Sequence, residues 1–227
     1  RSWGQGAQHS QALHSFFMHT PGLKVVAPAT PYDAKGCLIQ SIRDNNPVMF
    51  IEHRMLFSQK SVVPQNLYTV DFGKARILSI GQDITIVGVS YMAVECLRAQ
   101  KFLQEATVAA EVIDPVSLVP LDIDTILKSV KKSGKLLVVD TGWTSCGASA
   151  EIIARVCEKL GSLKDIQVQR IGFAPTPCPT TKNLENLFYP NAQKIAIAAY
   201  KMVGKKGGLK FQKDFEAPEI IQFKGPF

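Results

Sequence analysis

The sequence lacks the features that mark membrane-spanning, disulfide-rich and zinc-binding proteins. No uninterrupted apolar run approaches the ~20 residues that a helix needs to cross a bilayer. The five cysteines are odd in number, widely spaced, and contain no Cys-x-x-Cys pair. We therefore expect no membrane partner, no zinc site, and reduced thiols in the cytoplasm or in a mitochondrial or plastid matrix.

Nucleotide-binding motifs are also missing. No Gly-x-Gly-x-x-Gly follows a predicted strand, so a dinucleotide site has no support. Residues 140–149 follow a strand and open a helix, as a phosphate loop does. However, Ala148 stands where that loop requires a lysine after its second glycine. We interpret this stretch as a tight strand-to-helix turn.

Positive charge exceeds negative charge, but its distribution does not indicate nucleic-acid binding. The 26 Lys and Arg against 19 Asp and Glu give a net charge of +7. The lysines are scattered, and their modest clusters are not interleaved with aromatic residues. We expect no nucleic-acid partner and assign the excess to a solvated face or an acidic protein partner.

The first 57 residues show a pattern typical of an α/β layer. It predicts a helix over 8–18, a strand over 23–27, a helix from Thr30 to Arg43 and a strand over 48–52. Thr30 can cap the second helix, Pro31 suits its first position, and Asp33 lies at the positive end of the helix dipole. Helices and strands alternating at this spacing predict parallel strands.

A second α/β region follows a polar, proline-containing linker over 58–74. Residues 75–203 predict an open sheet covered on both faces, and residues 204–227 predict an extended C-terminal arm. The expected strands are 77–80, 84–89, 109–113, 136–139 and 166–171, and the expected helices are 92–104, 123–131, 148–160 and 192–203.

The start of the chain suggests that it is a piece of a longer protein. An α/β sheet rarely begins with a helix whose preceding strand is absent. We therefore interpret residues 1–57 as the end of a domain whose beginning lies elsewhere.

The glycine-rich stretch over 3–11 carries the candidate catalytic residue, His9. Flanked by amides and a hydroxyl, His9 is placed by this turn at the start of a helix, where unpaired N–H groups can receive an anion. An imidazole exchanges protons near neutral pH, which suits a catalytic role. From these residues alone, a capping or packing role for His9 remains open.

The other histidines do not form a metal-binding pattern. His14 and His19 lie five and ten residues after His9, so the three do not share a helical face at the i, i+4 spacing. Glu52 and His53 close a strand at the carboxyl edge of the sheet, where open α/β sheets bind ligands. A direct role for either and an ordinary polar strand end both remain open.

Several ordered stretches resemble a known family. The sequence is similar to the beta subunit of the thiamine-diphosphate-dependent decarboxylating component of 2-oxo acid dehydrogenase complexes, of pyruvate and branched-chain types. The resemblance runs from about residue 3 to residue 202. It rests on residues 8–11, 21–26, 30–36, 42–48, 73–75, 83–87, 111–114, 118–122 and 147–152.

The resemblance implies an α/β fold in which the end of a pyrimidine-binding domain precedes a transketolase C-terminal-like domain. It implies a heterotetramer of alpha and beta subunits with thiamine diphosphate between them. The alpha subunit supplies the magnesium-diphosphate site, and the beta subunit supplies the pocket for the aminopyrimidine ring. A 2-oxo acid is decarboxylated, and the acyl group passes to a lipoyl arm of the acyltransferase core. The implied partners are the alpha subunit, a second beta subunit and that core.

Particular residues take roles through the resemblance. His9 matches the active-site histidine of the family, which handles protons or the acyl transfer. Ser41, Asp44 and Asn46 match a helix-end turn whose carbonyls hold potassium in some members, although an ordinary helix stop explains them equally well. No cofactor-binding residue is assigned.

The sequence also departs from the family. The family's beta subunit begins about a hundred residues earlier, and that part carries the glutamate that activates the cofactor. The run Asp114-Pro115-Val116-Ser117 stands where many members have an arginine. We therefore expect the chain by itself to be inactive. A non-catalytic assembly module and part of a transketolase-type enzyme are the alternatives, and the 2-oxo acid is not determined.

Overall fold

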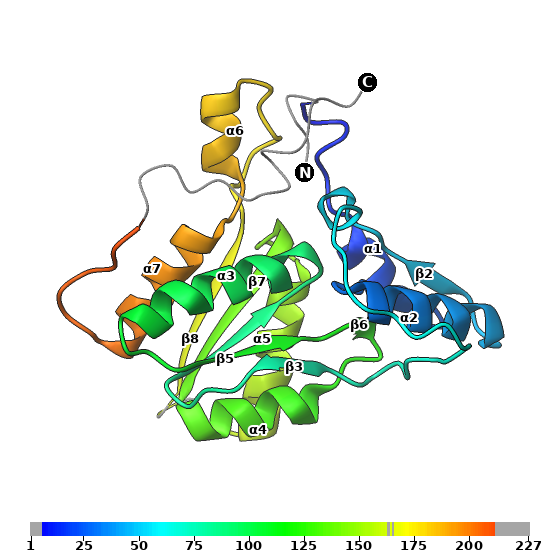
Figure 1. Ribbon diagram of the computed structural model, residues 1–227, viewed down its shortest axis with the longest axis horizontal. Coiled ribbons are helices and arrows are strands. Elements are labelled where there is room, and N and C mark those ends of the chain that lie inside the picture. Colours follow the sequence, from blue (N-terminus) through cyan, green and yellow to red (C-terminus); the bar gives the residue numbers. More distant parts are fainter. Residues whose placement is uncertain (1–5, 163, 165, 212–227) are drawn as a thin grey trace.

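The computed structural model of this chain contains two β-sheets with helices packed against them (Figure 1). The structure describes residues 6–162, 164 and 166–211. The smaller sheet has three strands in the order β2-β1-β6, and the larger has five in the order β3-β5-β4-β7-β8. The strands are β1 (Lys24–Val26), β2 (Val48–Phe50), β3 (Arg76–Ser79), β4 (Ile84–Gly88), β5 (Ala110–Asp114), β6 (Ser117–Val119), β7 (Lys135–Trp143) and β8 (Gln167–Phe173). The helices are α1 (His14–Met18), α2 (Pro31–Arg43), η1 (Arg54–Leu56, a 3-10 turn), α3 (Tyr91–Glu105), α4 (Ile123–Ser133), α5 (Ala148–Leu160), α6 (Lys182–Phe188) and α7 (Ala192–Val203).

The small sheet begins as the sequence predicts. Strands β1 and β2 are parallel, and α2 connects them. At the start of α2, the Asp33 N–H donates a hydrogen bond to Thr30 Oγ1 at 3.0 Å, and Pro31 takes the first helical position. The capping residues therefore fix this helix start, which lies at the carboxyl end of β1.

The first helix is shorter than predicted, because α1 starts at His14 and residues 6–9 form a turn. Gly6 has a φ of +71°, in the left-handed region that favours glycine. The Ser10 hydroxyl donates to the Gly6 carbonyl at 2.6 Å, and the Gln11 amide donates to the Ala7 carbonyl at 3.3 Å. These side chains occupy carbonyls that a helix would use, so His9 lies on a turn five residues before α1.

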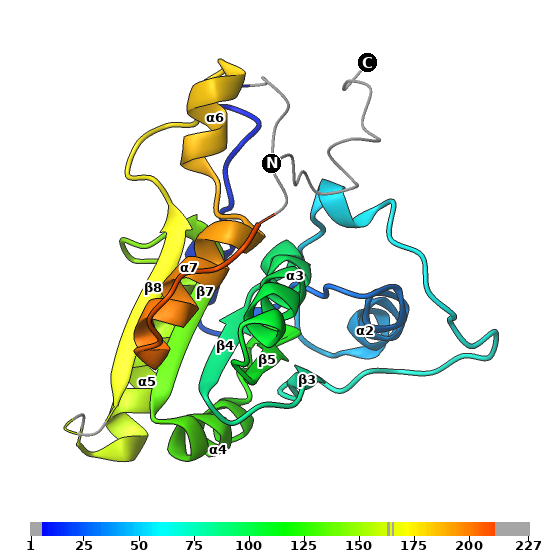
Figure 2. The same ribbon diagram turned by 60° about the vertical axis from the view of Figure 1, so that its left-hand side comes forward.

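The large sheet matches the expected α/β arrangement. Strands β5, β4, β7 and β8 are parallel, and β3 pairs antiparallel with β5 at one edge. Helices α3 and α7 cover one face, and α4 and α5 cover the other (Figure 2). Every residue of β4 and β5 is buried, including the polar residues Thr85, Glu111 and Asp114, because helices cover both faces of the sheet.

After β5 the chain leaves the large sheet, and β6 pairs antiparallel with β1 of the small sheet, so that Val25 lies opposite Val119. In Figure 1 it reaches from the green part of the chain to the blue part. The chain turns at Val116, whose φ is +57° and whose N–H donates to Asp114 Oδ1 at 2.9 Å. As a result, Val25 of β1 and Leu118 of β6 belong to one apolar core with α4 and α5.

The linker carries no helix or strand over 58–74, and it folds back on α2. The Tyr68 hydroxyl donates to the Tyr32 carbonyl at 2.8 Å, and the two rings stack with centroids 4.5 Å apart. The Lys35 ammonium donates to the carbonyls of Pro64 and Asn66. Of the expected arm over 204–227, residues 204–211 form no helix or strand, and residues 212–227 lie outside the described residues.

We expect Leu118→Ala to destabilise the whole described chain, because its side chain is 2% exposed in the core that both sheets share. Removing a buried leucine costs about 2–5 kcal/mol of unfolding free energy. Scanning calorimetry should show a single transition at a lower Tm. Ile80→Ala is the control: Ile80 is 87% exposed, and its loss should change stability by less than about 0.5 kcal/mol. Two separate transitions in the unsubstituted chain would contradict a shared core.

Candidate functional site

His9 lies exposed on its turn. The flanking residues rest against the α/β region over residues 75–203, which we call the second domain. A Cβ built on Gly6 would come 2.9 Å from Thr180 Cγ2. Ala12 packs against an aromatic cluster that includes Phe173 and Phe188. In Figure 2 this first segment runs beside α6. The turn with the predicted catalytic histidine is therefore positioned by residues far along the chain.

A buried ion pair follows the turn, and no sequence pattern indicated it. His14 Nε2 lies 2.9 Å from Asp140 Oδ1, and the two side chains are 2% and 0% exposed. Burial favours a neutral imidazole, but the negative charge of Asp140 and its hydrogen bond to the ring outweigh this effect. The pKa of His14 is therefore raised above its ordinary value.

The turn between β7 and α5 leaves room for this ion pair. A Cβ on Gly142 would lie 3.4 Å from His14 Cε1. A Cβ on Gly147 would lie 3.6 Å from Asp140 Oδ2 and would overlap the Trp143 carbonyl oxygen at 2.1 Å. Gly147 also caps α5, whose positive dipole end favours a carboxylate nearby. The strand-to-helix turn predicted from the sequence is confirmed, and its glycines admit the imidazole and the carboxylate.

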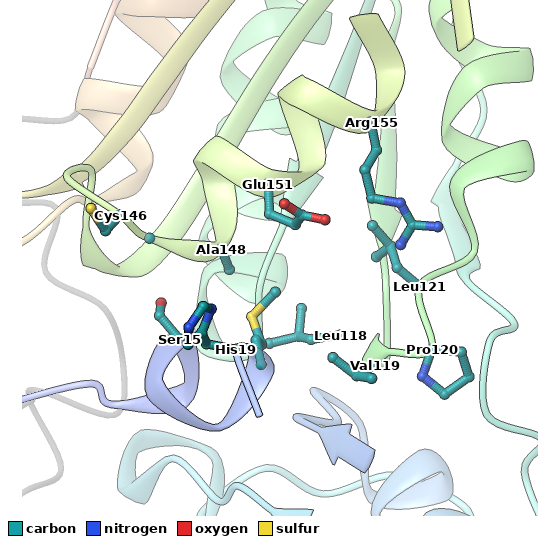
Figure 3. A pocket seen from close by; sticks show the side chains of 12 residues that line it. Ser15, His19, Leu118, Val119, Pro120, Leu121, Cys146, Ala148, Glu151 and Arg155 are labelled. Atoms are coloured by element: carbon teal, nitrogen blue, oxygen red, sulfur yellow. The ribbon is translucent and has the colours of Figure 1, made fainter. Parts of the chain in front are cut away.

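A pocket of about 440 Å³ lies next to the ion pair, between α1, β6 and α5. Figure 3 shows Glu151 and Arg155 of α5 above it and His19 at the end of α1 below it. Leu118 and Leu121 form its apolar wall. The pocket therefore offers an apolar surface with charges of both signs.

A second pocket, of about 300 Å³, opens at the carboxyl ends of β1 and β2. Phe50, Ile51 and Glu52 line it together with the start of α2. His53 also lines it, but its Nδ1 accepts a hydrogen bond from the Met55 N–H at 3.3 Å, and its ring stacks on Tyr91. These contacts support a capping and packing role for His53, whereas Glu52 remains exposed.

The predicted potassium residues Ser41, Asp44 and Asn46 lie together at the end of α2. Asp44 Oδ2 accepts from the Lys24 ammonium at 2.6 Å, and Oδ1 accepts from the Asn46 N–H at 2.9 Å. The hydrogen bond from Lys24, aided by those from Asn46, lowers the pKa of Asp44 to about 2. The Ser41 hydroxyl donates to the Cys37 carbonyl. Asp44 and Asn46 bind each other, and Ser41 binds a carbonyl within α2. The potassium site on the backbone carbonyls of this turn stays a prediction.

A second charged cluster joins the two domains, and the sequence did not predict it. Both carboxylate oxygens of Asp33 accept from the Arg76 guanidinium, the Nε contact being 2.8 Å. Arg76 lies opposite Asp114 in the β3–β5 pairing. Burial, together with the charge of Asp33, raises the pKa of Asp114 to about 7 against the opposing effects of Arg76 and of N–H donors such as Val116. Within residues 6–162, 164 and 166–211, no group of three or more His, Cys, Asp or Glu is placed to hold a metal ion.

Comparison with known families covers most of the chain. The pyrimidine binding domain of transketolase matches residues 4–60, and the transketolase C-terminal domain matches residues 73–195. The chain belongs to the transketolase C-terminal domain family. The gap between the two matches falls inside the expected linker. This family membership confirms the predicted fold class, in which the end of a pyrimidine-binding domain precedes a transketolase C-terminal-like sheet.

Relatives of this transketolase-family chain include two beta subunits. The beta subunit of acetoin:2,6-dichlorophenolindophenol oxidoreductase from Cupriavidus necator is 44% identical over 203 residues, which are 89% of this chain and 59% of the relative. The mitochondrial pyruvate dehydrogenase E1 component subunit beta of Dictyostelium discoideum is 38% identical over 201 residues, which are 87% of this chain and 56% of the relative. The resemblance to such beta subunits is thereby confirmed. The chain spans less than two thirds of the length of both relatives.

Solved structures agree on the fold. A split-gene transketolase, described as an inactive beta4 tetramer, superposes with a TM-score of 0.71 at 22% identity, covering 87% of this chain and 63% of the other. In addition, among the helices of the described part, none has the length and apolar character that crossing a membrane requires.

We expect the stabilisation from the His14–Asp140 ion pair to depend on pH. Because folding raises the pKa of His14, the stabilisation is complete below the ordinary histidine value of about 6.5 and is lost as pH rises through the raised folded pKa. Each unit of that increase corresponds to about 1.4 kcal/mol. Urea unfolding between pH 5.5 and 9 should show this loss of unfolding free energy as pH rises.

The reference for this experiment is the double variant His14→Gln/Asp140→Asn, which does not titrate in that range. The advantage of the unsubstituted chain over it should shrink as pH rises. Asp114 is present in both proteins, so its own titration cancels. An advantage that stays constant across the range would contradict the prediction.

Proposed function

We propose that this chain is part of the beta subunit of a thiamine-diphosphate-dependent 2-oxo acid dehydrogenase, with His9 acting in acyl transfer to a lipoyl group. The observation that carries the proposal is the position of His9, exposed on a turn that both domains hold. The order of the two transketolase-type matches and the relatives named as beta subunits support it.

The chemistry of acyl transfer suits an accessible imidazole. When a lipoyl group accepts an acyl group, the carbon left by decarboxylation of the 2-oxo acid forms a carbon–sulfur bond and is oxidised by two electrons to the acyl level. Those two electrons reduce the disulfide as its sulfur–sulfur bond breaks, and the leaving sulfur takes a proton. A histidine near neutral pH can donate that proton and be recharged from solvent. His9 meets the requirement for access because its side chain is exposed, whereas His14 is buried and ion-paired.

The described residues fit one wall of a cofactor site. Thiamine diphosphate, when bound, supplies the thiazolium on which a 2-oxo acid loses carbon dioxide. Within the second pocket, Phe50 and Ile51 offer an apolar surface and Glu52 a polar edge, which suits part of an aromatic ring with hydrogen-bonding groups. We assign the magnesium-diphosphate site to the alpha subunit.

The proposed assembly contains an alpha subunit, a second beta subunit and a lipoyl acyltransferase core. We place it in the cytoplasm or in an organelle matrix, and the mitochondrial relative supports the matrix. The carbonyls of the turn formed by Ser41, Asp44 and Asn46 are proposed to hold potassium, beside the Lys24–Asp44 ion pair.

His9→Ala, introduced into the full-length beta subunit and assembled with its alpha subunit, should reduce acylation of a lipoyl domain by about 10²-fold or more. Reduction of an artificial dye with the same 2-oxo acid should persist, because it does not require the leaving sulfur to be protonated. Steady-state assays of the two reactions test this split.

The matched control is Gln8→Ala on the same exposed turn, which should keep both rates within about twofold. Near-normal lipoyl acylation in the His9 variant would reject the assignment. Turnover of sugar phosphates without activity on 2-oxo acids would instead favour a transketolase-type enzyme.

Calorimetric titration of the 227-residue chain alone with thiamine diphosphate and Mg²⁺ should show no micromolar binding. The described residues provide one wall of a pocket and no carboxylate cluster for the metal. The full-length protein with its alpha subunit serves as the positive control. Micromolar binding by the chain alone would show that it contains a complete cofactor site.

A further inference from the structure

The segment that carries His9 contacts the second domain at both of its ends and near Ala12. We define residues 6–14 as the histidine strap. We propose that Asp140 of the second domain is a positioning residue for His9, acting through the buried His14 at the end of this strap. The catalytic part of this inference rests on the function proposed above for His9.

Three contacts hold the strap. Gly6 meets Thr180 at one end, Ala12 packs on the aromatic cluster in the middle, and His14 contacts Asp140 at 2.9 Å at the other end. Ser10 is 1% exposed, and its hydroxyl closes the turn on the Gly6 carbonyl. The first two contacts are apolar, so the buried ion pair is the electrostatic restraint among them.

The ion pair also lies at the start of α1, which has no side-chain cap. Leu13 precedes α1 and makes no side-chain capping bond, so α1 begins without the usual polar restraint. His14 is the first residue of α1, and its ring reaches across to β7. Within the described part of the chain, neither the carboxylate oxygens of Asp140 nor the His14 Nε2 atom makes a hydrogen bond of good geometry, so the charge contact between these two side chains is what offsets their burial. The buried carboxylate and the start of α1 therefore depend on the same contact.

This arrangement links the position of His9 to the turn between β7 and α5. Asp140 lies near the end of β7, and Gly147 at the start of α5 leaves room beside it. A displacement of about 1 Å at a catalytic group can cost about 10²-fold in rate. Losing the ion pair should therefore affect the step that needs His9 more than steps that do not.

The test uses Asp140→Asn in the full-length beta subunit assembled with its alpha subunit. Acylation of a lipoyl domain should fall at least about tenfold, while dye reduction with the same 2-oxo acid stays within about twofold. Hydrogen exchange of the amides in residues 6–14 should become faster. Asp124→Asn is the matched control, because Asp124 also forms an ion pair, with Lys159 at 3.0 Å, but is 79% exposed. It should change none of the three measurements.

A second variant keeps the test decisive if Asp140→Asn folds poorly. His14→Gln/Asp140→Asn removes both charges and retains two side chains that can hydrogen-bond, so it should recover most of the lost acylation. Failure to recover in a folded double variant, an equal fall of both rates in Asp140→Asn, or unchanged exchange in residues 6–14 would each overturn the inference. If the unsubstituted assembly performs neither reaction, the proposed function fails, and the exchange measurement alone decides whether Asp140 fixes the strap.

Discussion

The antiparallel pairing of β6 with β1 is the constraint on which the rest of the arrangement depends. It brings a strand of the second domain into the small sheet, so Val25 and Leu118 share a core with α4 and α5. Once that core has formed, the carboxyl edge of the large sheet faces α1 and α2. Two charge contacts between the domains, His14 with Asp140 and Asp33 with Arg76, lie at this junction.

These charge contacts differ in what they restrain. The side chain of Arg76 is 40% exposed and binds Asp33 in the first turn of α2, so solvent screening weakens this contact. The His14–Asp140 pair is almost fully buried and tethers a segment that otherwise makes apolar contacts. Breaking a buried pair leaves an uncompensated charge, which costs far more than losing an exposed one. The histidine strap is therefore restrained more tightly than its surface location suggests.

Local chemistry explains which parts of the fold could be predicted. Thr30 and Pro31 identify the start of α2, and short, mostly apolar, β-branched stretches identify β4 and β5, because these signals lie within the elements themselves. Strand β6 has three residues and follows a positive φ at Val116, so neither its length nor its pattern marks it. The predicted helix over 8–18 was wrong before His14, because the polar side chains of Ser10 and Gln11 bind carbonyls within the turn.

In the candidate site, too, only the residue with a local sequence signal was predicted. His9 was found from a glycine turn and from resemblance, both of which are readable in one stretch of sequence. Asp140, the partner of His14, lies on β7, and no sequence pattern near either residue indicates that the two meet. Asp114 likewise gave no signal, because its raised pKa depends on burial and on Asp33, which lies on a different element.

The pairing of β1 with β6 also bears on the order in which the protein can fold during synthesis. Lys24–Val26 leave the ribosome long before Ser117–Val119, which close one edge of the small sheet. Until β6 emerges, β1 exposes an unpaired edge that can join another chain. The apolar side chains of the small sheet are also uncovered until α4 and α5 have been synthesised. A chaperone would therefore be needed most after β1 and β2 emerge and before β6, α4 and α5 follow.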